Sequence, residues 1–243
     1  MRIALLSDVH SNLAALDAVL AHAKGQGYEA VWHLGDLVGY GPDPDEVIAR
    51  MVEEGAVGVM GNHDAAVAGI IGLEAFNERA AEAASWTMGA VSKASLAYLS
   101  ALPRMVEDGP YTRVHGTAND PMWEYLSTYD SAQRHFDSVR TPYSVVGHTH
   151  LPLVVREIEG GGVGATAPES GECVELGEGP VCLNPGGVGQ PRDGDPRSSY
   201  ALLDSEACTV TFHRVEYDIA ETQRRMRECG LPVMLIERLA VGR

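Results

Sequence analysis

Residues 2–10 read RIALLSDVH, residues 30–36 read AVWHLGD, and residues 57–64 read VGVMGNHD. Each stretch is a short apolar run that ends in polar residues, which is typical of a buried strand followed by a turn. Helical stretches separate the three runs, so the order is strand, helix, strand, helix, strand. This order predicts parallel strands with helices packed outside them, and the predicted fold class is α/β.

The first helix has signals at both of its ends. Ser11 or Asn12 is the expected N-cap, because a side-chain oxygen at that position accepts a hydrogen bond from the first helical turn. Gly25 and Gly27 favour the end of the helix. The other elements expected in this part of the chain are strands at 2–7, 30–34 and 57–60 and a helix at 44–54.

Beyond residue 64 the chain changes from helices to short strands joined by turns. Residues 73–102 are rich in Ala, Glu and Leu and contain no proline, which predicts two helices with a break near Gly89. The glycine-rich residues 159–171 are interpreted as a hairpin loop. Further strands are expected at 111–115, 143–147, 151–157, 173–176, 180–183, 200–204 and 209–215, largely antiparallel from residue 151 onward, with a last helix at 219–229.

The organisation of the chain points to a single unit. We find no internal repeat and no low-complexity domain, so one domain with two sheets is expected over residues 1–243. Within it, the helical segment at about 65–102 is interpreted either as ordinary packing or as a cap over a site.

Composition limits the classes of partner. The net charge is −16, from 34 acidic and 18 basic residues, which argues against non-specific binding to nucleic acid or to an anionic membrane. The four cysteines show no CxxC spacing, so reduced, buried thiols in a cytoplasmic protein are expected. The N-terminal apolar run is too short for a signal sequence, and no stretch is long enough for a membrane span.

Polar clusters follow five of the expected strands. In an open α/β sheet the carboxyl ends of strands are where ligands bind, so these clusters can converge on one pocket. Carboxylate, amide and imidazole ligands without cysteine suit Mn, Fe, Co, Ni or Zn. Asp36 stands alone on the middle strand and is the natural bridge between two ions. The candidate residues are Asp8, His10, Asp36, Asn62, His63, Asp64, His115, His148 and His150.

Each cluster also has an ordinary interpretation. The Gly-Asp pair that includes Asp36 is a common turn, Asp64 is a possible helix cap, and His115 alone is a common polar residue. The succession of clusters, each after a strand, favours a metal site over chance. Glycines beside the clusters permit the backbone to approach the metal site closely. They are Gly35, Gly61, Gly116 and Gly147.

In this order, DVH, GD, GNHD, a later histidine and GHTH resemble the calcineurin-like metallophosphoesterase superfamily. The segment LNPGGVGQPRDGDP at 183–196 makes the chain most similar to small bacterial and archaeal phosphodiesterase-like members. The resemblance implies a four-layer α/β/β/α sandwich with two mixed sheets. It also implies two divalent metal ions, with manganese favoured, and in-line attack on phosphorus by a hydroxide shared between them.

The resemblance assigns a role to each cluster. One ion would be held by Asp8, His10, Asp36 and His150, and the other by Asp36, Asn62, His115 and His148. By the same resemblance, His63 would face the leaving group with a pKa near the working pH, and Asp64 would orient its ring.

Three residues outside the clusters have two interpretations each. Asn12 would reach a substrate phosphate or simply cap its helix. Arg192 would clamp a phosphate or form a surface salt bridge. Tyr40 would line the pocket mouth or belong to an ordinary turn. The remaining histidines are expected to be structural: His33 in the core, and His22, His135 and His213 structural or exposed.

The sequence thus predicts a dimetal hydrolase of a small phosphate ester, most simply a phosphodiesterase. The alternatives are a phosphomonoesterase, such as a protein or nucleotide phosphatase, and a non-catalytic metal-binding scaffold. Retention of His63 with the whole ligand set argues against the scaffold. The physiological substrate, the native metal pair and the oligomeric state do not follow from the sequence.

Overall fold

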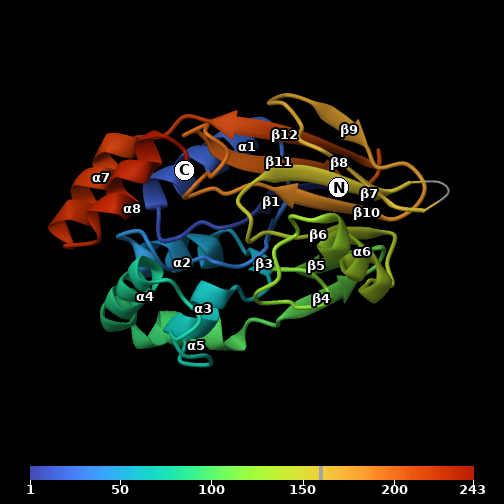
Figure 1. The fold of residues 1–243 in the computed structure, drawn as a ribbon. Helices are drawn as coiled ribbons and strands as arrows, with labels where there is room; N and C mark the ends of the chain where they lie inside the picture. The colour runs from blue at the N-terminus through green and yellow to red at the C-terminus, as the bar shows by residue number, and fades with distance from the viewer. Residues whose placement is uncertain (159–160) are drawn as a thin grey trace.

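Two six-stranded mixed sheets form the centre of the computed structural model, which describes residues 1–158 and 161–243 (Figure 1). The first sheet has the order β3-β2-β1-β11-β12-β9, and the second has the order β4-β5-β6-β10-β7-β8. The strands of the first sheet are β1 (Arg2–Leu6), β2 (Ala30–His33), β3 (Val57–Gly58), β9 (Cys173–Glu175), β11 (Ser198–Asp204) and β12 (Thr209–Val215). Those of the second are β4 (Met105–Asp108), β5 (Tyr111–Val114), β6 (Tyr143–Val145), β7 (Pro152–Glu157), β8 (Val163–Thr166) and β10 (Val181–Pro185).

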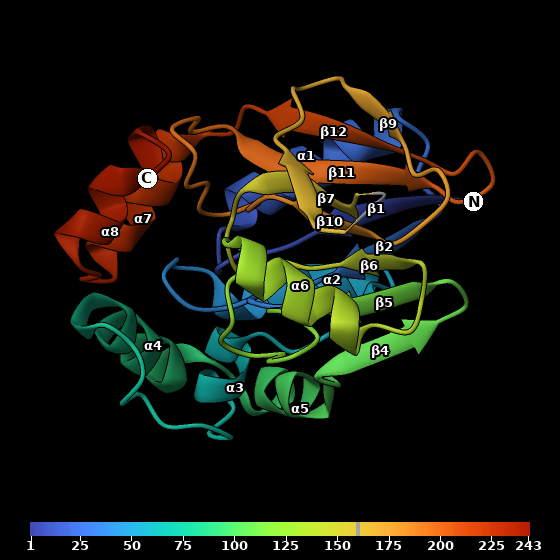
Figure 2. The same cartoon turned by 45° about the vertical axis from the view of Figure 1, so that its right-hand side comes forward.

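Helices cover the outer face of each sheet. In the first sheet β1, β2 and β3 are parallel, and the connecting helices α1 (Leu13–Gly25) and α2 (Pro44–Glu53) pack against that sheet. In the second sheet β5, β6 and β10 are parallel, and α6 (Tyr129–Ser138) lies over its outer face (Figure 2). The layers are therefore helix, sheet, sheet, helix, which confirms the predicted four-layer sandwich.

The alternation of side chains along β1 shows how the layers are joined. Ala4 and Leu6 point toward α1 and α2, whereas Ile3 and Leu5 pack among side chains of the second sheet. Successive residues of a strand face opposite sides, so a strand buried on both faces is apolar throughout. The continuous apolar run at the start of the sequence has this physical cause.

The remaining helices gather at one end of the sheets. They are α3 (Asn62–Val67), α4 (Glu78–Ala90), α5 (Lys93–Ala101), α7 (Ile219–Glu228), α8 (Val233–Glu237) and the 3₁₀ helix η1 (Arg238–Ala240). Buried side chains of α4 and of the C-terminal helices form one apolar cluster that includes Tyr40. Among the described residues, none of the helices has the length and apolar character needed to cross a membrane.

Several details of the sequence prediction need correction. The break between α4 and α5 falls at Val91 and Ser92, because Ser92 caps α5 with its own side chain. The glycine-rich stretch 159–171 includes β8 and is not loop throughout; its residues 159 and 160 lie outside the described residues. Elements without a prediction are β4, α6 and α8, while α3 begins three residues before the predicted helical segment at about 65–102.

The cysteines are free, but they are not uniformly buried. Cys182 is buried, Cys229 is partly buried, and Cys173 and Cys208 are exposed. The expectation of four buried thiols is therefore wrong for two of them.

Candidate metal centre

The predicted polar clusters meet at the end of the sheets where the parallel strands finish. Asp8 and His10 follow β1, Asp36 follows β2, His115 follows β5, and the GHTH segment follows β6. Residues of the GNHD segment begin α3. All nine predicted cluster residues are at most 4% exposed. The structure thus brings together side chains from 8 to 150 in the sequence.

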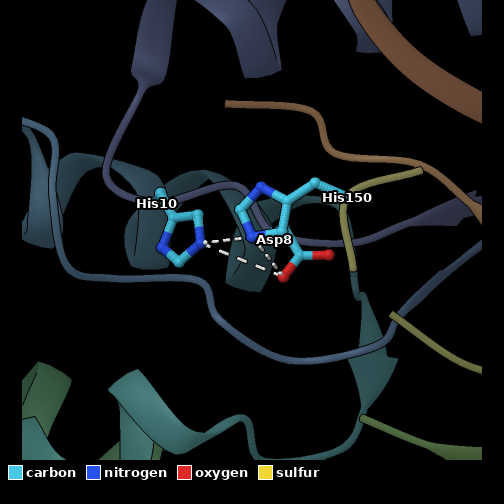
Figure 3. A group of neighbouring side chains, drawn as sticks. All are labelled: Asp8, His10 and His150. Carbon is cyan, nitrogen blue, oxygen red and sulfur yellow. Dashed lines mark hydrogen bonds and ion pairs between the residues drawn. The ribbon is translucent and has the colours of Figure 1, made fainter. Parts of the chain in front are cut away.

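One group of ligand atoms comes from Asp8, His10 and His150 (Figure 3). The Nε2 atoms of the two histidines are 3.2 Å apart. Asp8 Oδ1 lies 3.2 Å from Nε2 of His150 and 3.9 Å from Nε2 of His10. These three atoms surround one small volume.

The protonation of the His10 and His150 rings indicates which kind of ligand would bind between these three atoms. Nδ1 of His10 lies 3.0 Å from the Val38 carbonyl oxygen, and Nδ1 of His150 lies 2.6 Å from that of Gln190. A carbonyl only accepts, so both Nδ1 atoms carry the proton and both Nε2 atoms carry a lone pair. Two lone pairs and a carboxylate oxygen that face one another are stabilised by a cation, and backbone carbonyls commonly orient metal-binding histidines in this way.

A second group surrounds His115. Its Nε2 lies 3.3 Å from Asp36 Oδ2, 3.2 Å from Asn62 Oδ1 and 3.1 Å from His148 Nδ1. Nδ1 of His115 lies 2.6 Å from the Leu34 carbonyl oxygen and donates to it, so Nε2 is the atom that faces the group and offers a lone pair once its proton is lost. His148 is oriented in the opposite sense, with Nε2 lying 3.3 Å from the Trp123 carbonyl oxygen and Nδ1 facing the group.

Asp36 joins the two groups. Its Oδ2 lies 3.3 Å from Nε2 of His115 and 3.7 Å from Nε2 of His10, whereas its Oδ1 accepts the backbone N–H of His63 at 2.8 Å. One oxygen is thus held by the backbone and the other lies between the two ligand sets. Gly61 permits this arrangement, because a Cβ there would collide with Asp36 Oδ1.

The ligand loops carry unusual backbone conformations. A positive φ is uncommon for residues other than glycine, and it persists where the surrounding structure holds it. Such residues gather at functional sites, so their distribution supports one here. The predicted ligands with positive φ are Asp8 (54°), His10 (49°), Asp36 (53°), His148 (65°) and His150 (61°).

Burial and neighbouring charge set the protonation of the site. Burial lowers the pKa of His10 and His150 well below its ordinary value, so both rings are neutral and offer their lone pairs. Burial raises the pKa of Asp8 to about 7. At His115, burial is outweighed by Asp36, which together with other neighbours raises the pKa to about 9. A proton and a metal ion compete for such ligand atoms, so metal binding releases protons here.

His63 lies over the site, but its environment differs from the prediction. Its ring lines a hollow with Asp36, and its Nδ1 is buried against Gly39 without a hydrogen-bond partner among the described residues. Burial lowers its pKa to about 4, although Asp36 acts in the opposite direction. The expectation of a pKa near the working pH is therefore wrong for this environment, and the ring is neutral at neutral pH.

Asp64 does not orient the ring of His63. Its Oδ2 accepts the N–H of Gly61 at 3.0 Å, and its Oδ1 accepts the N–H of Val38 at 3.2 Å. The physical reason is its position in the first turn of α3, where a carboxylate reaches back to the N-cap. Asp64 thus fixes the backbone on which Asp36 and His63 meet.

Asn12 caps α1 and is not available to substrate. Its Oδ1 accepts from Ala15 N and from the hydroxyl of Thr222, and its Nδ2 donates to the Gly189 carbonyl. The substrate role predicted for Asn12 is corrected by these contacts.

Arg192 lies at the hollow above the ligands. It forms no salt bridge among the described residues; its Nη2 donates to Gln190 Oε1 at 3.1 Å, and its guanidinium lies 5.9 Å from the centre of the Tyr40 ring. Tyr40 lines the same hollow and contacts the rings of His10 and His63. Both residues thus face the site.

Sequence reasoning missed an aromatic wall of the site. The ring of Tyr125 stacks on His148 with centroids 4.0 Å apart, and Phe76 contacts both His63 and Trp123. None of these three residues belongs to a polar cluster after a strand, so no local pattern marked them. The histidines outside the site are structural: His33 and His135 are buried, and His22 and His213 pack against Tyr200.

Comparisons with known proteins agree with this geometry. The family model described as "Calcineurin-like phosphoesterase superfamily domain" matches residues 1–207. An uncharacterized protein of Methanocaldococcus jannaschii is 35% identical, over 99% of this chain and 98% of its own length. A metallophosphoesterase structure from Sphaerobacter thermophilus is 46% identical, with a TM-score of 0.91 over 100% of this chain and 99% of that one. A hypothetical protein of Pyrococcus horikoshii shares the fold, with a TM-score of 0.80 at 22% identity over 100% and 98% of the two chains.

The fold and the clustered ligands are those of a metal-dependent phosphoesterase. The family model matches most of this chain, which shows that the chain belongs to the calcineurin-like phosphoesterase superfamily, as the resemblance predicted. The superfamily is dimetal-dependent, and candidate ligand clusters for two ions are present.

Proposed function

We propose that this protein is a phosphodiesterase that hydrolyses a small organic phosphodiester with two divalent cations, of which manganese is the favoured one. The observation that carries the proposal is the position of Asp36 Oδ2 between the two histidine sets. A carboxylate oxygen shared by two nitrogen-rich sets supports a pair of ions held close together. Such a pair activates water and offsets the charge of the reacting phosphoryl group.

The chain's own groups have separable roles in this proposal. The ligands Asp8, His10, Asp36 and His150 would hold one ion, and Asp36, Asn62, His115 and His148 the other. The neutral ring of His63 would donate a hydrogen bond from its N–H to the leaving oxygen and stabilise the charge that develops there as the P–O bond breaks. Arg192 lines the same hollow and would face the phosphoryl oxygens, since a planar guanidinium suits two of them.

The surroundings of the site favour a diester over a monoester. Tyr40 and Asn77 line the hollow above the ligands and also a larger adjoining hollow, so an organic group has room on that side. Trp123 and Tyr125 form another wall of the site, on which a second organic group would pack. A monoester would fill only one of these spaces.

The proposal is tested with the protein loaded with Mn²⁺ and two chromogenic substrates. Bis(4-nitrophenyl) phosphate is expected to give a higher kcat/KM than 4-nitrophenyl phosphate, and EDTA is expected to abolish both activities. A higher kcat/KM for the monoester would favour the phosphatase alternative. Absence of turnover on either ester, with two ions bound per chain, would support a non-catalytic scaffold.

A further inference from the structure

A second hollow of about 470 Å³ adjoins the metal centre. It lies between the start of α4 and the C-terminal elements α8 and η1, and it shares Tyr40 and Asn77 with the hollow above the ligands. The two hollows are therefore adjacent to each other. Its other lining residues are Arg79, Met234, Leu235, Arg238, Val241 and Arg243.

The charge of this hollow is opposite to that of the protein. Three arginines and no Asp or Glu side chain line it, although the chain carries a net charge of −16. Arg79, Arg238 and Arg243 form no ion pair within residues 1–158 and 161–243, whereas half of the sixteen arginines do. Nε of Arg238 donates to the main-chain oxygen of Arg243, which leaves its terminal NH₂ groups without a partner among the described residues. Guanidinium groups without an acidic side chain as partner, gathered in one concave place, form a site that suits an anion.

Arg238 lines the second hollow together with Tyr40, and Arg192 lines the hollow above the ligands together with the same tyrosine. Burial, followed by the positive charge of Arg192, lowers the pKa of Arg238 to about 10, so the two guanidinium groups are close enough to repel each other. Nε of Arg192 is buried without a partner among the described residues. An anion seated between these groups would relieve the repulsion and accept their unused N–H groups.

We propose that this hollow, called here the arginine hollow, binds a second phosphate group of the substrate. This inference rests on the proposed function and names its substrate class: an organic phosphodiester that carries a further phosphate. Arg79 and Arg238 bind that phosphate, while Arg192 lies between it and the scissile group. The apolar side chains of Met234, Leu235 and Val241 pack against the organic part that joins the two phosphates.

The arginine hollow is tested first without metal and without turnover. Metal-free protein in EDTA is titrated with inorganic tripolyphosphate by calorimetry, for the unchanged chain and for Arg238→Gln. We expect binding that weakens by about tenfold or more in Arg238→Gln, as for the loss of a charged hydrogen bond. Arg79→Gln, at an exposed side chain, is expected to weaken binding in the same direction and covers the case that Arg238→Gln fails to fold.

The matched control is Arg227→Gln, which removes one positive charge from an exposed residue of α7 outside the arginine hollow. It is expected to leave tripolyphosphate affinity unchanged. Equal weakening by Arg227→Gln and Arg238→Gln would reduce the effect to net charge and overturn the proposal. Absence of binding to the unchanged chain would overturn it as well.

A second test uses the Mn²⁺-loaded enzyme and a matched pair of substrates. Thymidine 5′-(4-nitrophenyl phosphate) and its 3′-phosphorylated counterpart release the same chromophore and differ by one phosphate. The 3′-phosphate is expected to lower KM by about tenfold with little change in kcat, and Arg238→Gln is expected to remove that advantage. An equal KM for both substrates would contradict the proposal. Failure to hydrolyse either one would count against the phosphodiesterase activity, while the metal-free titration would still report on the arginine hollow.

Discussion

The Nε2 atoms of His10 and His150 lie 3.2 Å apart, and each ring has its Nδ1 proton committed to a backbone carbonyl. Two lone pairs are therefore held against each other inside the protein, where a charge between them is poorly screened by water. This pair is stable in the presence of a cation and unfavourable in its absence. The folded state should accordingly depend on metal.

Removal of metal is expected to lower the thermal midpoint. A ligand present at about a thousand times its Kd stabilises a protein by about 4 kcal/mol, which corresponds to roughly 10 °C for a chain of this size. Scanning calorimetry of the Mn²⁺-loaded and EDTA-treated protein measures the shift. His150→Ala relieves the repulsion between the two lone pairs but leaves a buried cavity, so its metal-free midpoint is expected to stay close to that of the unchanged metal-free protein while its metal-induced gain is smaller. Identical midpoints with and without metal would contradict this account of the pair.

Replacement of His63 separates chemistry from metal binding. His63→Ala is expected to lower kcat by about 10²–10³, the usual range for the loss of one hydrogen-bond donor to a developing negative charge, and to retain two ions per chain. His63 Nδ1 has no hydrogen-bond partner among the described residues, so the replacement breaks no hydrogen bond at that atom. Metal content by atomic emission and turnover of the chromogenic diester are measured on the same sample. Loss of metal in His63→Ala would make it a ligand instead, which the closeness of His10, Asp36 and His63 allows geometrically.

Asp64 is expected to act through stability. Asp64→Ala leaves the buried N–H groups of Gly61 and Val38 without their acceptor, which costs about 2–4 kcal/mol. Urea unfolding of metal-free protein measures the loss, and Asp64→Asn, which keeps one acceptor oxygen, is expected to lose less. Full stability combined with a turnover loss equal to that of His63→Ala would restore the role of Asp64 in orienting the ring.

His135, which lies outside the metal centre, is expected to contribute to the pH dependence of the free energy of unfolding. Burial lowers the pKa of His135 to about 4, where its Nδ1 accepts the Ala118 N–H and its Nε2 donates to Ser144. An unfolded histidine titrates near 6.5, so as pH falls the unfolded chain takes up the proton first. Stability is therefore lost between about pH 6.5 and pH 4, by at most about 3 kcal/mol, and no further below that.

Unfolding free energies at a series of pH values measure this contribution. His135→Gln is expected to show a shallower loss of stability over the same interval than the unchanged metal-free protein. Parallel curves for the two proteins would show that His135 is not kept neutral by burial.

The central strands of the fold could be predicted from the sequence because each of them is a continuous apolar run of residues. A strand that is buried on both faces, such as residues 2–6, is apolar throughout and can be recognised without knowledge of its tertiary contacts. Helix α6 has no such pattern, because its buried apolar side chains are only Ala132 and Phe136 in an otherwise polar stretch. No residue of the edge strand β4 is fully buried, so no apolar pattern in the sequence predicted that strand either.

The candidate site divides in the same way. Ligands that follow strands were predictable, because the strands carry them to one edge. The role of Asp64 was not, since a carboxylate three residues after Gly61 suits both a helix cap and a partner for histidine. Tyr125 and the arginine hollow depend on contacts between segments distant in sequence, and no short-range pattern reports such contacts.

The central claim is that Asp36 lies between two ions held close together. Electron paramagnetic resonance of the Mn²⁺-loaded protein tests it directly, because two manganese ions that share a bridging oxygen are magnetically coupled. The unchanged protein is expected to bind two Mn²⁺ per chain with a coupled spectrum, and Asp36→Ala is expected to lose that coupling. A single ion per chain, or the six-line spectrum of isolated Mn²⁺ in the unchanged protein at full occupancy, would contradict the account.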